Sequence, residues 1–268
     1  MPFLSINGVD LYYLEEGKKG ETLVFGHSML FNLHMFDQQV DYLKKDHRCI
    51  RLDFRGHGRS ASPDDGYDLD TQTEDFVQLM RALKCAPCHL VGFSMGGMVA
   101  LRVAIKYPEL IKSLILIDTS SEPEAKKEMM RNRAMLFIAK HIGLKPIANK
   151  VLHMFFGKTF LNDPARKELR TIWKNHFLAN NREGIVKAVE GVLYREGVTD
   201  KIGEIQHPTT ILVGEHDQLT DLDKAEIIQS NILHASLKII PRAGHMSPVE
   251  EPDIVNSLIE RHLKSILP

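Results

Sequence analysis

The sequence has little cysteine, no excess charge of either sign and no long hydrophobic run. Its three cysteines, Cys49, Cys85 and Cys88, are an odd number among 268 residues, which argues against a disulfide framework. Lys and Arg (34) balance Asp and Glu (35), so the surface as a whole is not expected to attract nucleic acid. No apolar run approaches the roughly 18 residues that a membrane span needs.

The N-terminal residues also lack the basic and apolar regions of a secretory signal. We therefore expect a cytoplasmic protein with neither a membrane span nor a nucleic-acid partner. The remaining composition, 43% hydrophobic and 26% charged, is that of an ordinary globular protein. A chain of this length buries enough surface to fold without disulfides or structural metals.

Strand-like and helix-like segments alternate along much of the chain. Asn7-Gly8 lies between two short alternating runs, which is a strong hairpin signal. The expected strands are 3–6, 9–14, 22–25, 48–53, 88–93, 112–118, 209–214 and 237–240, and the expected helices are 36–45, 73–83, 95–107, 222–232 and 249–267. This order predicts an α/β fold with a mostly parallel eight-stranded sheet and helices on both faces.

The alternation stops after the strand that ends at Asp118 and resumes at Thr209. We therefore expect a core domain made of residues 1–119 and 204–268, interrupted by a helical cap at residues 120–203. Most of the cap's apolar side chains are expected to form its own core, and some to line a pocket. They are Met129, Met130, Met135, Leu136, Phe137, Met154, Phe155, Phe156, Phe160 and Trp173.

The near-zero net charge hides an asymmetry. Residues 122–201 carry 16 Lys and Arg against 9 Asp and Glu, a net charge of +7, and the rest of the chain carries −8. Solvated lysine-rich helix faces are the simpler explanation of this excess. Attraction of an acidic substrate or partner is the alternative.

The sharpest motif is Gly92-Phe93-Ser94-Met95-Gly96, which matches G-x-S-x-G. A strand-like run precedes it and a helix-like run follows it, and this is the setting in which the motif lifts a serine hydroxyl out of a sheet. Free N–H groups at the start of the following helix favour negative charge there. Ser94 is therefore the candidate nucleophile.

A serine nucleophile needs a base, and the base needs an acid to orient it. Asp217 follows the strand-like run 209–214, and His245 follows the last expected strand. Loops at the carboxyl ends of parallel strands are where open α/β sheets place their sites. Asp118, at the end of another strand, is the second choice for the acid.

Nearly the whole chain resembles the α/β-hydrolase family. The resemblance lies in GFSMGG (92–97), DFRGHGRS (53–60), ILVGEHD (211–217) and AGH (243–245). It implies Ser94 as nucleophile, Asp217 as acid, His245 as base, and a helical cap inserted after the sixth strand. It also implies an oxyanion hole formed by the backbone N–H groups of Met95 and Met29, with Ser28 standing where the family usually has glycine.

The resemblance implies a carboxylesterase that acts on apolar esters of short or medium acyl chains, without a metal or an organic cofactor. The alternatives are a lactonase similar to 3-oxoadipate enol-lactonases, an esterase for an anionic or carrier-linked substrate, or a perhydrolase. A receptor that binds a ligand on this fold without turnover is the alternative from another class. The sequence leaves monomer and dimer equally open.

Three other patterns favour structural roles. Residues 53–60 are glycine-rich but match neither a P-loop nor a dinucleotide-binding motif. Cys85 and Cys88 have redox spacing, yet they lie before a strand rather than at a helix start, where thiolates are stabilised. His141, His153, His176 and His216 lack metal-ligand spacing.

Overall fold

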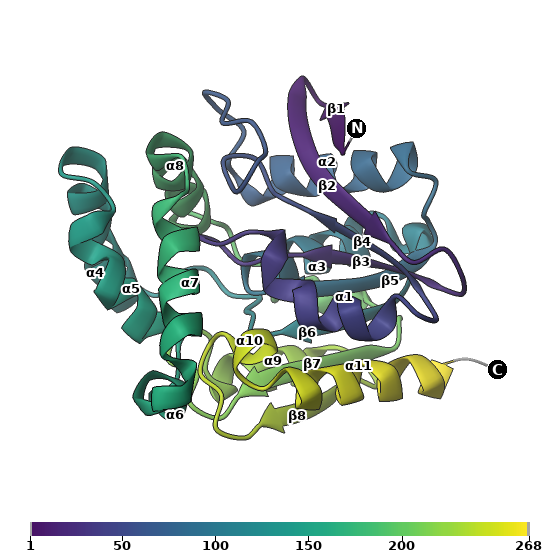
Figure 1. Cartoon of the computed structure of the whole chain (residues 1–268). Helices are drawn as coiled ribbons and strands as arrows, with labels where there is room; N and C mark the ends of the chain where they lie inside the picture. The colour runs from purple at the N-terminus through teal and green to yellow at the C-terminus, as the bar shows by residue number, and fades with distance from the viewer. Residues whose placement is uncertain (1, 267–268) are drawn as a thin grey trace.

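The computed structural model describes residues 2–266. Its centre is an eight-stranded sheet in the order β1-β2-β4-β3-β5-β6-β7-β8 (Figure 1). The β1–β2 and β2–β4 pairs are antiparallel, and all other neighbours are parallel. The predicted α/β fold with a mostly parallel sheet is confirmed.

The elements are the strands of the sheet, the helices that accompany it, and the helices inserted between β6 and β7. The strands are β1 (Phe3–Ile6), β2 (Val9–Glu16), β3 (Thr22–Gly26), β4 (Arg48–Leu52), β5 (Cys88–Phe93), β6 (Ile111–Ile117), β7 (Thr209–Gly214) and β8 (Ser236–Ile240). The helices that accompany the sheet are α1 (Asp37–Leu43), α2 (Leu69–Ala82), α3 (Met95–Lys106), α9 (Leu222–Asn231), α10 (Ser247–Glu250) and α11 (Pro252–Ile266). Between β6 and β7 lie α4 (Lys126–His141), α5 (Ala148–Phe155), α6 (Lys158–Asn162), α7 (Lys167–Leu178) and α8 (Arg182–Leu193).

Both faces of the sheet are covered because its strands alternate their side chains between two hydrophobic clusters. In β6, Leu114 and Leu116 join the cluster that includes residues of α2, α3 and α9. Ile115 and Ile117 of the same strand join the other cluster, with residues of α1 and α11. The central strands are apolar on both faces, as parallel strands between two helical layers must be.

Two predicted helices differ from those observed by more than two residues at an end. The helix expected at 73–83 begins at Leu69, because the Asp68 side chain caps its first turn by accepting from Thr71 N at 2.8 Å. The helix expected at 249–267 is two helices, α10 and α11. Pro252 opens α11, since a proline has no N–H with which to continue a preceding helix. Residue 267 of the expected helix lies outside the described residues.

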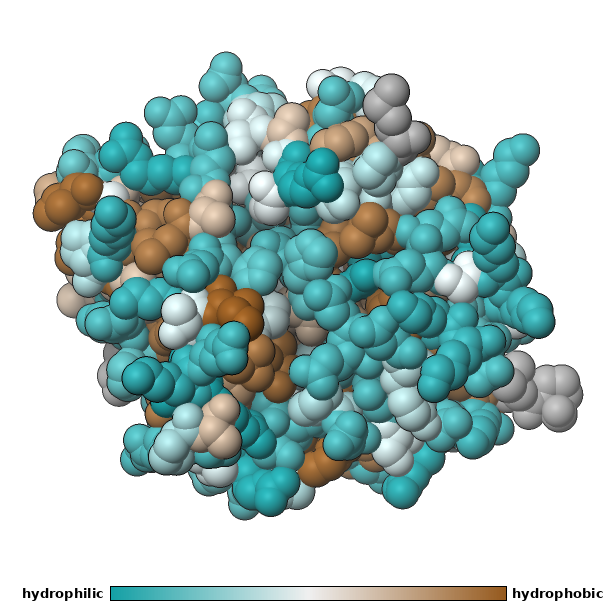
Figure 2. All heavy atoms as spheres, viewed as in Figure 1, coloured by the Kyte–Doolittle hydropathy of each residue, from teal (hydrophilic) through white to brown (hydrophobic). Residues whose placement is uncertain are grey.

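Helices α4–α8 gather at one end of the sheet (Figure 1). Phe155, Phe160 and Trp173 are buried, as expected. The expectation of burial is wrong for Met130 and Phe137, which are 75% and 62% exposed. Apolar side chains are visible at this edge of the molecule, over α4 (Figure 2). Within residues 2–266, no helix is long and apolar enough to cross a membrane.

Candidate active site

Ser94 occupies a strained turn between β5 and α3. Its backbone φ is 51° and its ψ is −115°, in a region that residues with a side chain rarely adopt. Hydrogen bonds from Ser94 N to Ile117 O (2.9 Å) and from Thr119 Oγ1 to Ser94 O (2.7 Å) hold this conformation. Strain maintained in this way is typical of a functional residue.

Two glycines of the motif allow the chain to turn this tightly. A Cβ on Gly92 would lie 2.6 Å from Gly96 O, and a Cβ on Gly96 would lie 2.0 Å from Gly26 O. The close approach of Gly96 to the end of β3 also brings Gly96 N within 3.0 Å of His27 O. The serine turn is therefore fastened to the loop that follows β3.

The structure brings Ser94, His245 and Asp217 together from three separate loops. Ser94 Oγ lies 2.9 Å from His245 Nε2, and His245 Nδ1 lies 2.8 Å from Asp217 Oδ2. All three residues are buried, with Ser94 retaining 8% of its exposure. A neutral imidazole that donates from Nδ1 to the carboxylate has Nε2 free to accept the serine proton.

Asp217 is held as an anion by several donors. Leu219 N donates to Oδ1 at 2.8 Å, and Thr220 Oγ1 donates to Oδ2 at 2.8 Å. Burial acts to raise the pKa of Asp217, but the neighbouring His245 and these donors keep that pKa below its ordinary value. A carboxylate here fixes the orientation of the His245 ring through the contact at Nδ1.

Asp118, the second choice for the acid, contacts other groups. Its Oδ1 accepts from Gly214 N at 2.7 Å, and its Oδ2 accepts from Ser247 Oγ at 2.6 Å. Burial and the nearby charge of Asp217 raise the pKa of Asp118 well above its ordinary value. Asp118 therefore ties together the loops that carry Asp217 and His245, without a hydrogen bond to the imidazole.

Glu250 supports the histidine loop, and the sequence analysis missed it. Its Oε1 accepts from Gly244 N (3.0 Å) and Met246 N (3.1 Å), on either side of His245. Its Oε2 accepts from Gly157 N (2.9 Å), which lies between α5 and α6. Burial raises the pKa of Glu250 to about 7 despite these donors. The only local signal was a charged residue close after His245.

The loop after β3 carries the first predicted oxyanion donor, Met29. Two buried histidines hold it: Phe54 N donates to His27 Nε2 at 2.9 Å, and Leu30 N donates to His57 Nε2 at 3.3 Å. Each ring also contacts a backbone carbonyl through Nδ1. Because burial lowers the pKa of both rings, to about 4 for His57, they act as neutral hydrogen-bonding groups. The 53–60 segment thus positions this loop.

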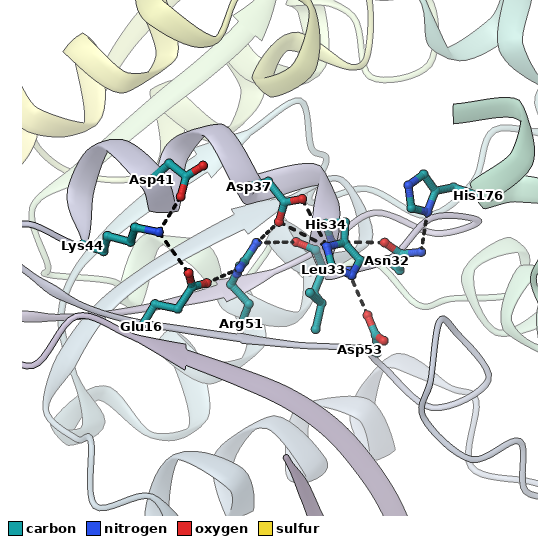
Figure 3. A network of polar contacts seen from close by, with 10 residues as sticks. All are labelled: Glu16, Asn32, Leu33, His34, Asp37, Asp41, Lys44, Arg51, Asp53 and His176. Carbon is teal, nitrogen blue, oxygen red and sulfur yellow. Dashed lines mark hydrogen bonds and ion pairs between the residues drawn. The ribbon is translucent and has the colours of Figure 1, made fainter. Parts of the chain in front are cut away.

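Helix α7 and the residues after it also form hydrogen bonds with this loop. Asn180 Nδ2 donates to Leu30 O at 2.7 Å. Figure 3 shows Asn32 pointing toward His176 of α7, with 3.1 Å between Asn32 Nδ2 and His176 Nδ1. In the same view, Asp53 accepts from Leu33 N at 2.8 Å. The segment between β6 and β7 is therefore hydrogen-bonded directly to the loop after β3.

The backbone N–H groups of Met29 and Met95 are the two predicted oxyanion donors. Within the described part of the chain, neither N–H has an internal hydrogen-bond acceptor. Met95 is fully buried at the first position of α3, and Met29 is half-buried. Both groups are thus available to a ligand oxygen, and their joint role stays a prediction. The hydroxyl of Ser28 is directed to Met29 O, at 3.0 Å.

A cavity of about 70 Å³ is lined by Ser94 and His245. An apolar pocket of about 80 Å³ shares part of its wall, including Met29, Phe155 and Leu219. Helices α4, α5 and α8 supply most of the other apolar residues of that pocket. A hydrocarbon chain can therefore lie in the pocket while its reacting group lies beside Ser94.

No group of three or more His, Cys, Asp or Glu side chains in residues 2–266 is arranged to hold a metal ion. Cys85 and Cys88 are buried free thiols away from the cavity.

Comparison with known proteins identifies the family. The alpha/beta hydrolase fold family matches residues 21–139. Proline iminopeptidase of Lactobacillus helveticus is 30% identical over 98% of this chain and 96% of its own length. 3-oxoadipate enol-lactonase 2 of Acinetobacter baylyi is 28% identical over 97% and 96%. The chain therefore belongs to the α/β-hydrolase fold family.

A solved structure agrees with this assignment over nearly the whole chain. A thermophilic esterase from Thermogutta terrifontis, with malate bound, is 26% identical, with a TM-score of 0.90 over 98% of each chain. This likeness and the two sequence relatives support hydrolysis as the class of reaction.

Proposed function

We propose that this protein is a serine hydrolase of carboxylic esters that works through an acyl-enzyme. The observation that carries the proposal is the unbroken relay from Ser94 through His245 to Asp217, with heavy-atom distances of 2.9 and 2.8 Å. Each distance is that of a hydrogen bond across which a proton can move. A ligand receptor has no use for all three groups, so the relay favours turnover over binding alone.

The first half of the reaction acylates the enzyme. His245 Nε2 takes the proton from Ser94 Oγ as that oxygen attacks the ester carbonyl, and Asp217 stabilises the imidazolium. The N–H groups of Met95 and Met29 receive the negative oxygen of the tetrahedral intermediate. The intermediate collapses when His245 returns the proton to the departing alcohol, which leaves the acyl group on Ser94.

The second half releases the acid. Water enters where the alcohol left, and His245 takes a proton from it as it attacks the acyl carbonyl. Collapse of the second intermediate breaks the bond to Ser94 Oγ, and His245 returns the proton to the serine. These steps need no metal or organic cofactor, so we propose none.

We also propose the division into a core (residues 1–119 and 204–268) and a cap (residues 120–203). Support comes from the pocket, because side chains of α4, α5 and α8 line it together with Met29 and Leu30 of the core. The cap then sets the acyl preference, and its apolar wall suits short to medium hydrocarbon chains.

Lactone hydrolysis is the second candidate. The same relay opens a cyclic ester, and the similarity to an enol-lactonase over 97% of the chain favours it. In a lactone the leaving oxygen stays tethered to the acyl group. The chemistry at Ser94 is otherwise unchanged.

The test is hydrolysis of p-nitrophenyl esters from acetate to decanoate by wild type, Ser94→Ala and a control, Ser230→Ala. Ser230 is exposed on α9, outside the cavity. We expect a maximum at one chain length, a loss of at least about 10⁴-fold in Ser94→Ala, and wild-type rates in the control. No turnover across the series, with none on lactones, would favour the receptor.

A further inference from the structure

The cavity that contains Ser94 has a charged side as well as an apolar one. Glu124, Arg131 and Arg195 line it together with Ser94 and His245. A charged side chain that is partly buried loses part of its solvation by water. It is therefore stabilised by a group of opposite charge, and that attraction is stronger there than in water. The partners of these three residues therefore indicate what else the cavity can bind.

Two of the three charges neutralise each other. Arg195 Nη1 donates to Glu124 Oε2 at 2.6 Å, and Arg195 Nε donates to Glu122 O at 2.9 Å. Asn132 Nδ2 donates a hydrogen bond to the other carboxylate oxygen, Glu124 Oε1, at 3.0 Å. Both carboxylate oxygens of Glu124 thus have donors, and Arg195 is fixed and 8% exposed.

Arg131 is the charge that remains. It is half-buried, and no carboxylate oxygen of residues 2–266 lies within 4.0 Å of its guanidinium nitrogens. Its hydrogen bond to a side chain is a long one, from Nε to Asn132 Oδ1 at 3.5 Å. A guanidinium has five N–H donors in a rigid fork, so most of this capacity faces the cavity or solvent without a protein acceptor.

We propose that Arg131 binds a carboxylate of the substrate, so that the ester or lactone cleaved at Ser94 is an anionic one. This inference rests on the proposed ester hydrolysis. The guanidinium fork matches the two oxygens of a carboxylate. Because Arg131 and Ser94 line the same cavity, one substrate can place its carboxylate at Arg131 and its ester at Ser94. The net charge of +7 on residues 122–201 attracts the same kind of substrate.

Two matched substrate pairs place the carboxylate on either side of the scissile bond. One pair is 4-acetoxybenzoate and its methyl ester, in which the charge lies on the alcohol side. The other is monomethyl adipate and dimethyl adipate, in which it lies on the acyl side. The measured quantity is the ratio of kcat/KM for the anionic member to that for the neutral member.

Three variants separate the charge of Arg131 from its bulk and from the general charge of α4. They are Arg131→Gln, Arg131→Lys and the control Arg133→Gln. Arg133 lies on the same helix, is exposed, contacts Tyr194 and does not line the cavity. The control removes the same formal charge from outside the site.

In wild type the anionic member of at least one pair should be favoured. Arg131→Gln should lower kcat/KM for that anionic member by about 10- to 100-fold, mainly through KM, and change the neutral member less than about twofold. Arg131→Lys should retain part of the preference, and Arg133→Gln all of it. Equal losses for both members, or a preference that survives in Arg131→Gln, would overturn the inference.

The outcomes also separate this inference from the proposed function. One outcome is that neutral esters are hydrolysed in a Ser94-dependent way while the ratio of kcat/KM values is the same in wild type and Arg131→Gln. In that case only the assignment of Arg131 is wrong. If neither pair is turned over, calorimetry with monomethyl and dimethyl adipate on Ser94→Ala, with and without Arg131→Gln, still measures the selectivity. Binding of the monoanion that does not depend on Arg131, or no binding at all, would likewise contradict the assignment.

Discussion

Glu250 forms hydrogen bonds to the backbone around His245 and none to its ring. One carboxylate oxygen accepts hydrogen bonds from the N–H groups on both sides of His245, and the other accepts from Gly157 in the helical segment. A single carboxylate therefore links the loop between α5 and α6 to the backbone on both sides of His245. Glu250 is a positioning residue by this geometry.

Substitution of Glu250 by Gln puts an NH₂ group where one of the carboxylate oxygens accepts N–H donors. A glutamine side chain has only one oxygen that accepts N–H donors. Either the hydrogen bond from Gly157 N or those from the histidine loop are therefore lost. We expect kcat per active site to fall about 10-fold with KM nearly unchanged. Active sites are counted by titration with an organophosphate. A structural role alone would reduce the number of sites and leave the kcat of each unchanged.

Asn180 offers a comparable test of the loop that carries Met29. Asn180→Ala removes the donor to Leu30 O, so this loop loses its contact with the residues after α7. We expect a fall in kcat of about 10-fold, less than the 10²- to 10³-fold that loss of a whole oxyanion donor costs.

Asn181→Ala is the matched control for that variant. The neighbouring Asn181 caps α8 by accepting from Gly184 N, at 2.9 Å. Its loss should lower the free energy of unfolding by about 1 kcal/mol and leave kcat unchanged. A larger effect on kcat from Asn181→Ala than from Asn180→Ala would contradict the assigned role of Asn180.

Asp217→Asn and Asp118→Asn compare the two candidate acids directly. Asp217→Asn should lower kcat by on the order of 10⁴-fold, because the amide favours the wrong tautomer of His245. Asp118 has a raised pKa and makes only neutral contacts, which an asparagine can reproduce, so Asp118→Asn should change kcat by about threefold or less. A reversed order of the two effects would assign the acid to Asp118.

His262 should make stability depend on pH. Burial, followed by the nearby His89, lowers the pKa of His262 in the folded protein to about 4 from 6.5. As the pH falls from 6.5 to 4, the unfolded chain therefore takes up this proton before the folded one, and stability is lost. His262→Asn should thus be most destabilising above pH 6.5. The difference from wild type should shrink by at most about 3 kcal/mol by pH 4.

Chemical denaturation of both proteins at several pH values measures that difference. Wild type loses the contribution of His262 across this window, while the variant has no such group to titrate. Parallel curves of unfolding free energy against pH would show that the burial of His262 has no such consequence.

The sequence predicted most of the fold and the candidate catalytic residues that the structure brings together, because each has a local signal. Ser94 lies within a five-residue motif, and Asp217 and His245 each follow a recognisable strand. Strands covered on both sides are apolar runs, which are easy to recognise, and Asn7-Gly8 marks the hairpin. The predicted sheet was confirmed for these reasons.

The residues that support the site could not be predicted in this way. Glu250 acquires its role from Gly157, 93 residues away, and Asn180 acquires its role from Leu30, 150 residues away. No local pattern encodes such contacts. The exposure of Met130 and Phe137 was missed for a related reason. Apolar residues lie on several sides of α4, so no single stripe indicates which side is buried.

The central claim is that Ser94 is the nucleophile of an acyl-transfer reaction. Its most direct test is the intact mass of wild type, Ser94→Ala and Ser230→Ala after treatment with a fluorophosphonate, which labels activated serines. The account predicts one adduct and complete loss of ester hydrolysis in wild type and Ser230→Ala, with the adduct mapped to Ser94, and no adduct in Ser94→Ala. An adduct on Ser94→Ala, or an unlabelled wild type that hydrolyses esters, would contradict it.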